Sequence, residues 1–283
     1  TARTLSILFF PYLYQLKLNE KEVLLEKLSY FKDVKEIMLF ERRFENNQSV
    51  ICFNDSEEGD RVIKAAQEEI SLKCLKNISF FVARNQVNIN LPLIDAAINW
   101  LRKHIFPAIG PQVNLTTYAE KELSKDKKES ERLVDFLNKA DFNITNITSE
   151  ELENSSFLKT TVEHTVENEN GTEKYLFPLK YESLGTQRIF GLATAINEAI
   201  DENKFLVIDE IENSLHNQLL YKLLFDFLKA DSTSQLIVTT HNDSLLELVD
   251  DLIRKDSVYF IEKDKAGVSD LYKLIDFKGI DKL

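Results

Sequence analysis

Two carboxylates stand side by side at the end of a short apolar segment. The segment Phe205–Ile208 is followed directly by Asp209 and Glu210. A doubly wound sheet presents its ligand site at the carboxyl ends of its strands, so both side chains would face a bound ligand. One carboxylate can hold Mg²⁺, which takes oxygen ligands, while the other orients or deprotonates an attacking water. Taken alone, the pair is a weak signal, because an apolar strand that ends in an acidic loop is common.

A second apolar segment, Gln235–Val238, ends in Thr239, Thr240 and His241. Sequential strands are usually neighbours in a sheet, so His241 is expected beside the two carboxylates. A neutral histidine at that place can bridge a γ-phosphate and the attacking water. The alternative is a strand-end histidine that is hydrogen-bonded to a nearby carbonyl group.

A third segment, ESLGTQR at residues 182–188, precedes an apolar stripe with helical spacing. Gly185 lets the backbone approach a ligand closely, and the start of a helix points free N–H groups outward. Together these features favour an anion site. An ordinary capped helix start is the alternative.

The three segments follow one another in the order ESLGTQR, FLVIDEIENSLH and LIVTTHN. This order and spacing resemble those of the ABC-type ATPases, which carry a signature motif, a Walker B motif, a D-loop and a switch histidine. The resemblance implies that Asp209 holds Mg²⁺, that Glu210 is the catalytic glutamate and that His241 is the switch histidine. It places the D-loop at residues 213–216. The residues implied to contact ATP are Ser183, Gly185, Thr186, Gln187 and Ser214.

A glutamine is a further candidate contact of the cofactor. Gln86 follows Arg84 and Asn85, just after the apolar residues 78–82. It is a candidate for the Q-loop, which senses the metal and couples the two lobes in ATPases of this type. A surface turn is the alternative for this segment.

A finer resemblance covers most of the chain. The segments KEIMLFER (residues 35–42), DFLNKADFN (135–143) and VYFIEKDKAGVSDLYKLIDF (258–277), with GTQR and ENSLH, resemble the bacterial AAA family ATPases grouped with abortive-infection and RloC-like proteins, which are related to SMC heads. The resemblance implies an ATP-dependent homodimer that uses ATP and Mg²⁺. It also implies a role in phage defence with a nuclease or another effector partner, without identifying that effector.

One part of the family's pattern is absent from the sequence. None of the seven glycines belongs to a G-x-x-x-x-G-K-[ST] loop (Walker A), which would supply backbone N–H groups and a lysine for the β- and γ-phosphates. The chain starts at Thr1 without a methionine, so we expect this N-terminal Walker A part to precede Thr1. The chain alone is therefore expected to be inactive as an ATPase.

Composition narrows the class of protein. The formal net charge of −12 disfavours nucleic acid and anionic membranes as partners, although a local basic patch can still bind DNA. No apolar run approaches the ~18–20 residues of a membrane helix. Two cysteines are too few for a disulfide framework or a zinc site, so we expect a cytoplasmic protein with reduced thiols.

The chain divides into three expected regions. Residues 1–57 have the pattern of antiparallel strands, residues 58–156 have helical periodicity, and residues 157–283 alternate strand and helix as a parallel sheet does. Together with the resemblance, this predicts an α/β P-loop NTPase of the ABC-ATPase type. The antiparallel β-subdomain and the helical lobe would be attached to the C-terminal half of the ATPase core.

The leading hypothesis is an ATP-binding and hydrolysing switch. Two subunits would sandwich two nucleotides, and the change of shape would gate a partner. The second hypothesis is a DNA-repair ATPase of the RecF or SMC kind, which a basic groove on the dimer would distinguish. Long SMC arms need sustained heptads, and the sequence has none. A transporter's ATP-binding subunit and a non-enzymatic scaffold are the remaining alternatives.

Overall fold

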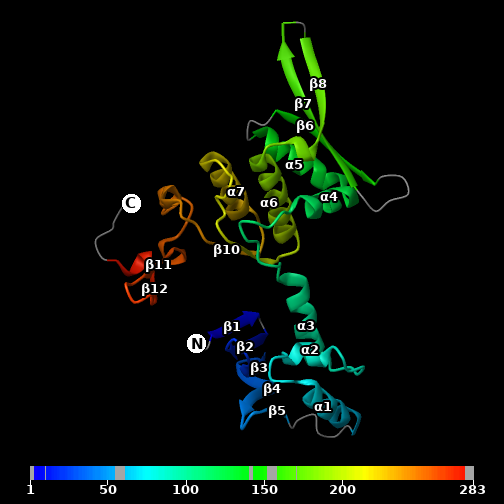
Figure 1. Cartoon of the computed structure of the whole chain (residues 1–283), viewed down its shortest axis with the longest axis vertical. Coiled ribbons are helices and arrows are strands. Elements are labelled where there is room, and N and C mark those ends of the chain that lie inside the picture. Colours follow the sequence, from blue (N-terminus) through cyan, green and yellow to red (C-terminus); the bar gives the residue numbers. More distant parts are fainter. Residues whose placement is uncertain are drawn as a thin grey trace. The chain divides into compact units, whose positions relative to one another are not determined.

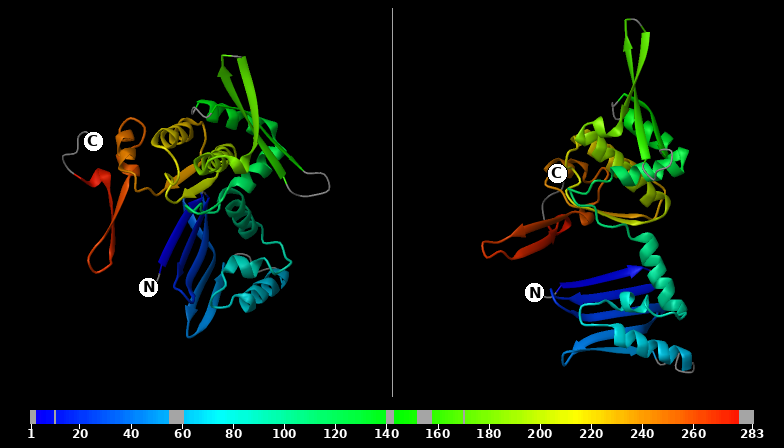
Figure 2. Two further views of the ribbon diagram at one scale, coloured as in Figure 1. Left: turned by 45° about the horizontal axis from the view of Figure 1, so that its top comes forward. Right: turned by 45° about the vertical axis from the view of Figure 1, so that its right-hand side comes forward.

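The computed structural model describes residues 3–9, 11–54, 61–139, 143–151, 158–169 and 171–277. The chain folds into two compact units, Thr1–Lys103 and His104–Leu283, and each is described by itself (Figure 1, Figure 2). The boundaries expected at 57/58 and 156/157 fall on residues outside the described ranges. The first compact unit extends to Lys103 because the first helices share a hydrophobic core with the N-terminal sheet.

The first unit begins with a five-stranded antiparallel sheet in the order β1-β2-β3-β4-β5, drawn in blue in Figure 1. Each strand pairs with the next one in the chain, as the sequence pattern predicts. Asn46 and Asn47 join the last two strands and have φ values of 49° and 64°, the left-handed geometry of a tight hairpin turn. The strands are β1 (Arg3–Phe9), β2 (Tyr12–Leu18), β3 (Val23–Lys32), β4 (Lys35–Glu45) and β5 (Gln48–Phe53).

Three helices pack against this sheet. They are α1 (Arg61–Lys73), α2 (Phe80–Arg84) and α3 (Pro92–His104). Each contributes apolar side chains to one core with the sheet, among them Ile70, Phe80 and Ile98. Phe80 stacks on Phe40 of β4, and both rings are fully buried. The helices therefore depend on the sheet for their stability, because short isolated helices are marginal in water.

A charged pair lies inside this core. Arg42 and Glu26 are both fully buried, and Arg42 Nη1 lies 3.4 Å from Glu26 Oε2. The Tyr14 hydroxyl donates to Glu26 Oε1 at 2.9 Å and the Phe80 N–H donates to Oε2 at 2.7 Å, while Arg42 Nη2 donates to the Leu75 carbonyl at 2.6 Å. Burial raises the pKa of Glu26, although these hydrogen bonds and Arg42 oppose the rise. The network ties the sheet to the loop before α2.

Replacing Arg42 by methionine should lower the free energy of unfolding by about 3 kcal/mol, since it leaves the Glu26 carboxylate buried without its cation. The loss should shrink as the pH falls, because protonation of Glu26 removes the uncompensated charge. Urea unfolding at several pH values measures both effects.

The matched control is Lys27→Met, which breaks the partly exposed pair of Lys27 and Glu36 at 2.9 Å. It should cost less than about 1 kcal/mol, since solvent screens such a pair. Equal losses for the two variants would show that the buried pair contributes no more than a surface pair.

The second unit contains a parallel sheet. β9 (Phe205–Ile208) and β10 (Gln235–Val238) pair in parallel, with the bounds expected from the sequence. Ile105 and Ile109 form parallel bridges to the other side of β9, so segment 105–109 acts as a third, irregular strand. The three segments run in one direction, and their carboxyl ends therefore meet at one edge of the sheet.

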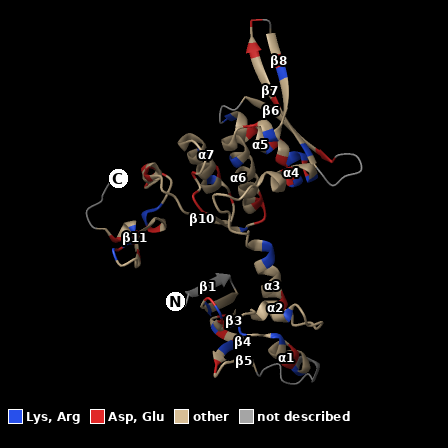
Figure 3. Ribbon diagram, in the orientation of Figure 1, with Lys and Arg blue, Asp and Glu red and all other residues tan. Residues whose placement is uncertain are grey.

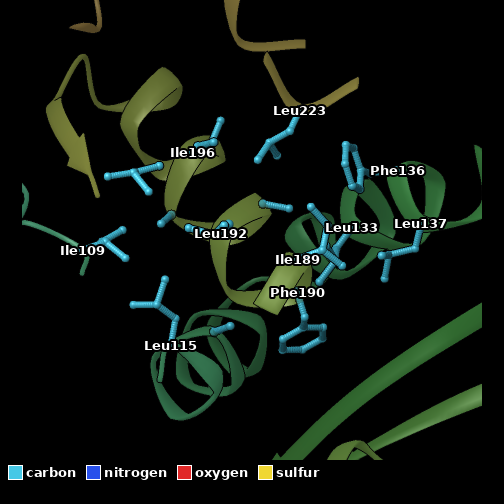
Figure 4. Close-up of a cluster of buried hydrophobic side chains, with 14 of the residues drawn as sticks. Ile109, Leu115, Leu133, Phe136, Leu137, Ile189, Phe190, Leu192, Ile196 and Leu223 are labelled. Carbon is cyan, nitrogen blue, oxygen red and sulfur yellow. The ribbon is translucent and has the colours of Figure 1, made fainter. Parts of the chain in front are cut away.

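Four helices accompany this sheet, and α6 is the central one. They are α4 (Thr116–Lys125), α5 (Lys127–Lys139), α6 (Leu184–Asp201) and α7 (Asn217–Lys229). Ile189, Leu192 and Ile196 recur at helical spacing on α6 and are buried. Figure 4 shows them among side chains of α5, α7 and the segment that precedes α4. The core of this unit is thus built around the helix that follows ESLGTQR.

A three-stranded antiparallel sheet, in the order β6-β7-β8, packs on α4 and α5. Its strands are β6 (Ile144–Glu151), β7 (Leu158–Asn168) and β8 (Gly171–Pro178). β7 and β8 pair as an antiparallel hairpin. β6 lies in the region expected to be helical. It forms a strand because Ile144 and Ile147 are buried against the helices while its backbone pairs with β7.

The remaining elements follow β10 or precede α6. They are η2 (Leu179–Tyr181), η3 (Asp243–Leu248), η4 (Lys255–Ser257), η5 (Leu274–Asp276), β11 (Tyr259–Lys263) and β12 (Ser269–Lys273). Acidic and basic residues are interspersed along α4 and α5 (Figure 3), and several form ion pairs within one helix, as Lys125 does with Glu122 at 2.7 Å. Among the described residues, no helix is long and apolar enough to cross a membrane.

Candidate functional site

The predicted carboxylates lie at the carboxyl edge of the parallel sheet. Asp209 and Glu210 follow β9, and Thr239 follows the neighbouring β10. The Thr239 hydroxyl donates to Asp209 Oδ1 and accepts the Glu210 N–H at 2.9 Å. One hydroxyl therefore joins both strand ends and fixes the two carboxylate residues relative to each other. Thr239 was not among the site residues predicted from the sequence, although it stands two positions before the predicted His241.

Glu210 adopts a backbone conformation that is uncommon for its residue type. Its φ of 47° lies in the left-handed region, where a non-glycine residue is strained. Such strain is concentrated at functional sites, because surrounding contacts must hold it in place. The turn aims Glu210 toward the end of β10, where Glu210 Oε1 lies 3.8 Å from His241 Nε2. The two predicted catalytic side chains are thus neighbours, and the histidine is 87% exposed.

Glu212 holds the backbone of the predicted switch histidine. Its Oε1 accepts the His241 N–H at 2.7 Å. Burial raises the pKa of Glu212, but hydrogen bonds from the His241 and Glu212 N–H groups and from the Thr240 hydroxyl outweigh it and leave the pKa below its ordinary value. A charged Glu212 can therefore fix the loop after β10 at neutral pH. Sequence reasoning missed this residue because nothing in its spacing distinguishes it from the carboxylates beside it.

The segment ESLGTQR forms the start of α6. Ser183 is the N-cap, and its hydroxyl oxygen accepts the Thr186 N–H at 3.1 Å. Gln187 Nε2 donates to the Glu182 carbonyl at 2.8 Å, which keeps the preceding turn in place. The ordinary capped helix start is therefore part of the structure. It does not exclude ligand binding, since Ser183 stays exposed to solvent.

Gly185 connects this helix start to the loop after β9. A Cβ atom on Gly185 would lie 2.8 Å from the Ser214 carbonyl oxygen, closer than any side chain tolerates. Ser214 itself has a φ of 63°, so a second left-handed residue shapes the same loop. The structure thus brings the predicted signature and D-loop residues into backbone contact within one unit. Glycine is needed at position 185 for this close approach.

Most of the chain matches the model of a known protein family. Residues 10–247 match the family described as "AAA domain, putative AbiEii toxin, Type IV TA system". The chain belongs to this family. The match confirms the predicted relationship to AAA family ATPases and the α/β class of the fold. An AAA domain of this kind is a nucleotide-binding ATPase domain.

Solved structures of SMC ATPase heads are similar to this AAA domain at low identity. The SMC head domain from Thermotoga maritima is 13% identical with a TM-score of 0.40, covering 89% of this chain and 74% of that chain. An SmcHead bound to the C-winged helix domain of ScpA is 12% identical with a TM-score of 0.39, covering 93% and 74%. A structure from work on ATP-driven dimerization and DNA-stimulated activation of SMC ATPases is 17% identical with a TM-score of 0.38, covering 55% and 88%. No curated protein matches the chain.

Gln86 is the one predicted site residue that lies in the first unit of the AAA domain. It is exposed and follows α2, where its N–H donates to the Ala83 carbonyl at 3.1 Å and its carbonyl accepts from Lys73 Nζ at 2.9 Å.

Gln112 is a second candidate for the Q-loop glutamine. It follows segment 105–109 and so lies at the sheet edge that carries Asp209. The turn-forming Gly110 and Pro111 just before it are the signal in the sequence.

The strand edge suits a magnesium ion that is held mainly by a nucleotide. No cluster of three or more potential metal-ligating side chains occurs in the described ranges, so a site built from protein ligands alone is absent there. Mg²⁺ in nucleotide sites is bound by one or two carboxylates together with phosphates and waters. Asp209 is exposed, and the Thr239 hydroxyl orients its carboxylate. This donor set fits Mg²⁺ brought in with ATP.

Proposed function

We propose that this AAA domain is part of an enzyme that binds ATP with Mg²⁺ and hydrolyses it to ADP and phosphate. Binding of ATP would bring two subunits together, and its hydrolysis would let them separate. The observation that carries the proposal is the Thr239 hydroxyl, which bonds both the Asp209 carboxylate and the Glu210 backbone. It keeps the two carboxylates at one strand edge with His241, where they can divide the work on a bound triphosphate.

Each side chain at the edge would have its own task. Asp209 would hold Mg²⁺, which neutralises negative charge on the phosphate oxygens when it is bound. Glu210 would accept a hydrogen bond from the attacking water and take its proton as the new bond to the γ-phosphorus forms and the bond to the ADP oxygen breaks. His241, 3.8 Å from Glu210 Oε1, would contact the γ-phosphate and the same water.

The signature segment would face a second subunit. Tyr181 and Leu184, on either side of Ser183 in the chain, are large apolar side chains that are 71% and 76% exposed. Removing such exposed apolar side chains from water would favour association with a second subunit. In the dimer, Ser183, Gly185 and Ser214 would contact the nucleotide of the other subunit, together with Gln187. Thr186, also predicted from the sequence, is only 4% exposed, and its hydroxyl lies 2.8 Å from Ser183 Oγ, so it would support Ser183 instead of contacting the nucleotide.

The family description supports a biological role for this switch. It names a putative toxin of a type IV toxin–antitoxin system, which fits a role in phage defence with an effector partner. The change of shape on hydrolysis would then control that partner. A DNA-repair role of the RecF or SMC kind predicts instead that duplex DNA stimulates hydrolysis.

The test uses the protein expressed from its complete reading frame. Phosphate release is measured with MgATP, with and without duplex DNA, beside the Glu210→Gln variant. The proposal expects release well above that of the variant and no stimulation by DNA. Release no greater than that of the variant would overturn the ATPase, and strong stimulation by DNA would favour the alternative role.

Residues 1–283 by themselves should release phosphate only at the background rate. Their sequence has no G-x-x-x-x-G-K-[ST] loop, so the β- and γ-phosphates would lack their main-chain N–H groups and their lysine. The measurement compares this chain with the complete protein at equal concentration. Turnover at the rate of the complete protein would show that the loop is dispensable.

A further inference from the structure

Arg188 lies on α6, five positions after the cap residue Ser183, and reaches across to the loop 110–113. Its Nη1 donates to the Val113 carbonyl at 3.1 Å and to the Gly110 carbonyl at 3.4 Å. Asn213 Nδ2 donates to the Pro111 carbonyl of the same loop at 2.9 Å. Three carbonyl groups of one short loop are therefore held by side chains from the signature helix and from the predicted D-loop.

Two glycines of α6 allow close contacts with the segment before α4 and with the loop after β9. A Cβ atom on Gly191 of α6 would collide with the side chain of Leu115 and lie 3.3 Å from its backbone, and Leu115 directly precedes α4. Gly185 meets the Ser214 carbonyl in the same manner. Neither contact leaves room for a side chain at the glycine. The packing is therefore close between α6, segment 110–115 and the loop after β9.

The guanidinium of Arg188 uses only part of its hydrogen-bonding capacity. Its Nε and Nη2 atoms are buried and have no hydrogen-bond partner among the residues that the structure describes. Burial lowers the pKa of its guanidinium, as expected for a cation whose charge is poorly compensated. Unsatisfied buried donors are uncommon in proteins, so these two atoms of Arg188 call for an explanation.

We infer that Arg188 is a positioning residue that ties the loop 110–113, and with it Gln112, to the signature helix. The inference rests on the proposed function, because it assigns to Arg188 the link between two parts of the ATPase site. When Gln112 moves toward or away from a nucleotide at its own strand edge, Arg188 carries that movement to α6. The presentation of Ser183 to the second subunit then depends on whether the first site is occupied.

Arg188→Met is the decisive variant, since methionine fills much of the same volume without a charge or a donor. Thermal stability should stay within about 2 °C of the native protein, because the lost hydrogen bonds are offset by removal of an uncompensated buried cation. The KM for ATP should change less than about threefold, while kcat and the ATP-dependent dimer fraction fall at least about tenfold. Arg188→Lys, which keeps a cation able to reach one carbonyl, should give intermediate values.

A double variant tests whether Arg188 and Asn213 act on the same loop. If both serve to hold residues 110–113, the fold-loss of kcat in Arg188→Met/Asn213→Ala should be smaller than the product of the two single losses. Independent roles would give the full product. That result would remove the shared loop as the link.

Two outcomes would overturn the inference. A native kcat in Arg188→Met would show that the contact of Arg188 with the loop 110–113 does not affect hydrolysis. A parallel fall of the melting temperature and kcat would show that Arg188 only supports the fold. Failure of the proposed function is a different result, since the native protein would then hydrolyse no ATP. Native hydrolysis with an unaffected Arg188→Met variant contradicts the role of Arg188 alone.

Discussion

Glu210→Gln should slow ATP hydrolysis by about 10²–10⁴-fold while nucleotide affinity is kept, since general-base assistance is worth that much. Glutamine preserves the size of the side chain and the hydrogen bond from the Glu210 N–H to Thr239, which belongs to the backbone. It removes only the basic oxygen near His241. The ATP-bound dimer should consequently be long-lived, and single-turnover hydrolysis together with nucleotide affinity measures both effects.

Asp209→Asn should instead weaken the binding of MgATP, because the carboxylate oriented by Thr239 is the one assigned to the metal. Glu247→Gln is the matched control, an exposed carboxyl-to-amide exchange on η3, and should leave both measurements unchanged. The division of labour is wrong if Glu210→Gln hydrolyses at the native rate. It is equally wrong if the Asp209 and Glu210 variants lose binding to the same extent.

Ser183→Arg should abolish ATP-dependent dimerisation while the monomer still binds nucleotide. Ser183 is exposed between Tyr181 and Leu184, so a bulky cation there would stand in the surface that meets the second subunit. A charge buried in such an interface without a partner is strongly unfavourable. Light scattering with a non-hydrolysable ATP analogue measures the dimer fraction, and fluorescence titration measures binding by the monomer.

Two further variants separate the interface from the helix cap. Ser183→Asn keeps an N-cap side chain for the Thr186 N–H, and Ser183→Ala loses the cap at a cost of about 1 kcal/mol without adding bulk. Alanine should stay dimerisation-competent if the cap is only structural. A native dimer fraction in Ser183→Arg would exclude the sandwich as proposed, whatever the smaller variants do.

Much of the local structure was predictable from short-range patterns. β9 and β10 have the predicted bounds because each is a short apolar run that polar residues end abruptly. The meander of β1 to β5 follows from alternation and from turn residues such as Asn46 and Asn47. The start of α6 follows from Ser183, a good N-cap before an apolar stripe.

Other elements were not predictable because their signals are weak or point elsewhere. Segment 105–109 lies beside β9 although Pro107 interrupts it, and proline argues against a strand. The position of Gln112 at the site edge follows only from that pairing. β6 was missed for a related reason, since its two buried isoleucines stand three residues apart, which is not the period of a regular strand.

By itself, the sequence determined which residue types follow the two parallel strands and which glycine precedes α6, and therefore the kind of chemistry to expect. Only the tertiary structure decided that Thr239 joins Asp209 to Glu210, that Gly185 meets Ser214 and that Arg188 holds the loop 110–113. The physical reason is the range of the forces. Periodicity, capping and turn preferences act within a few residues, whereas these contacts join segments far apart in the chain and depend on how the whole core packs.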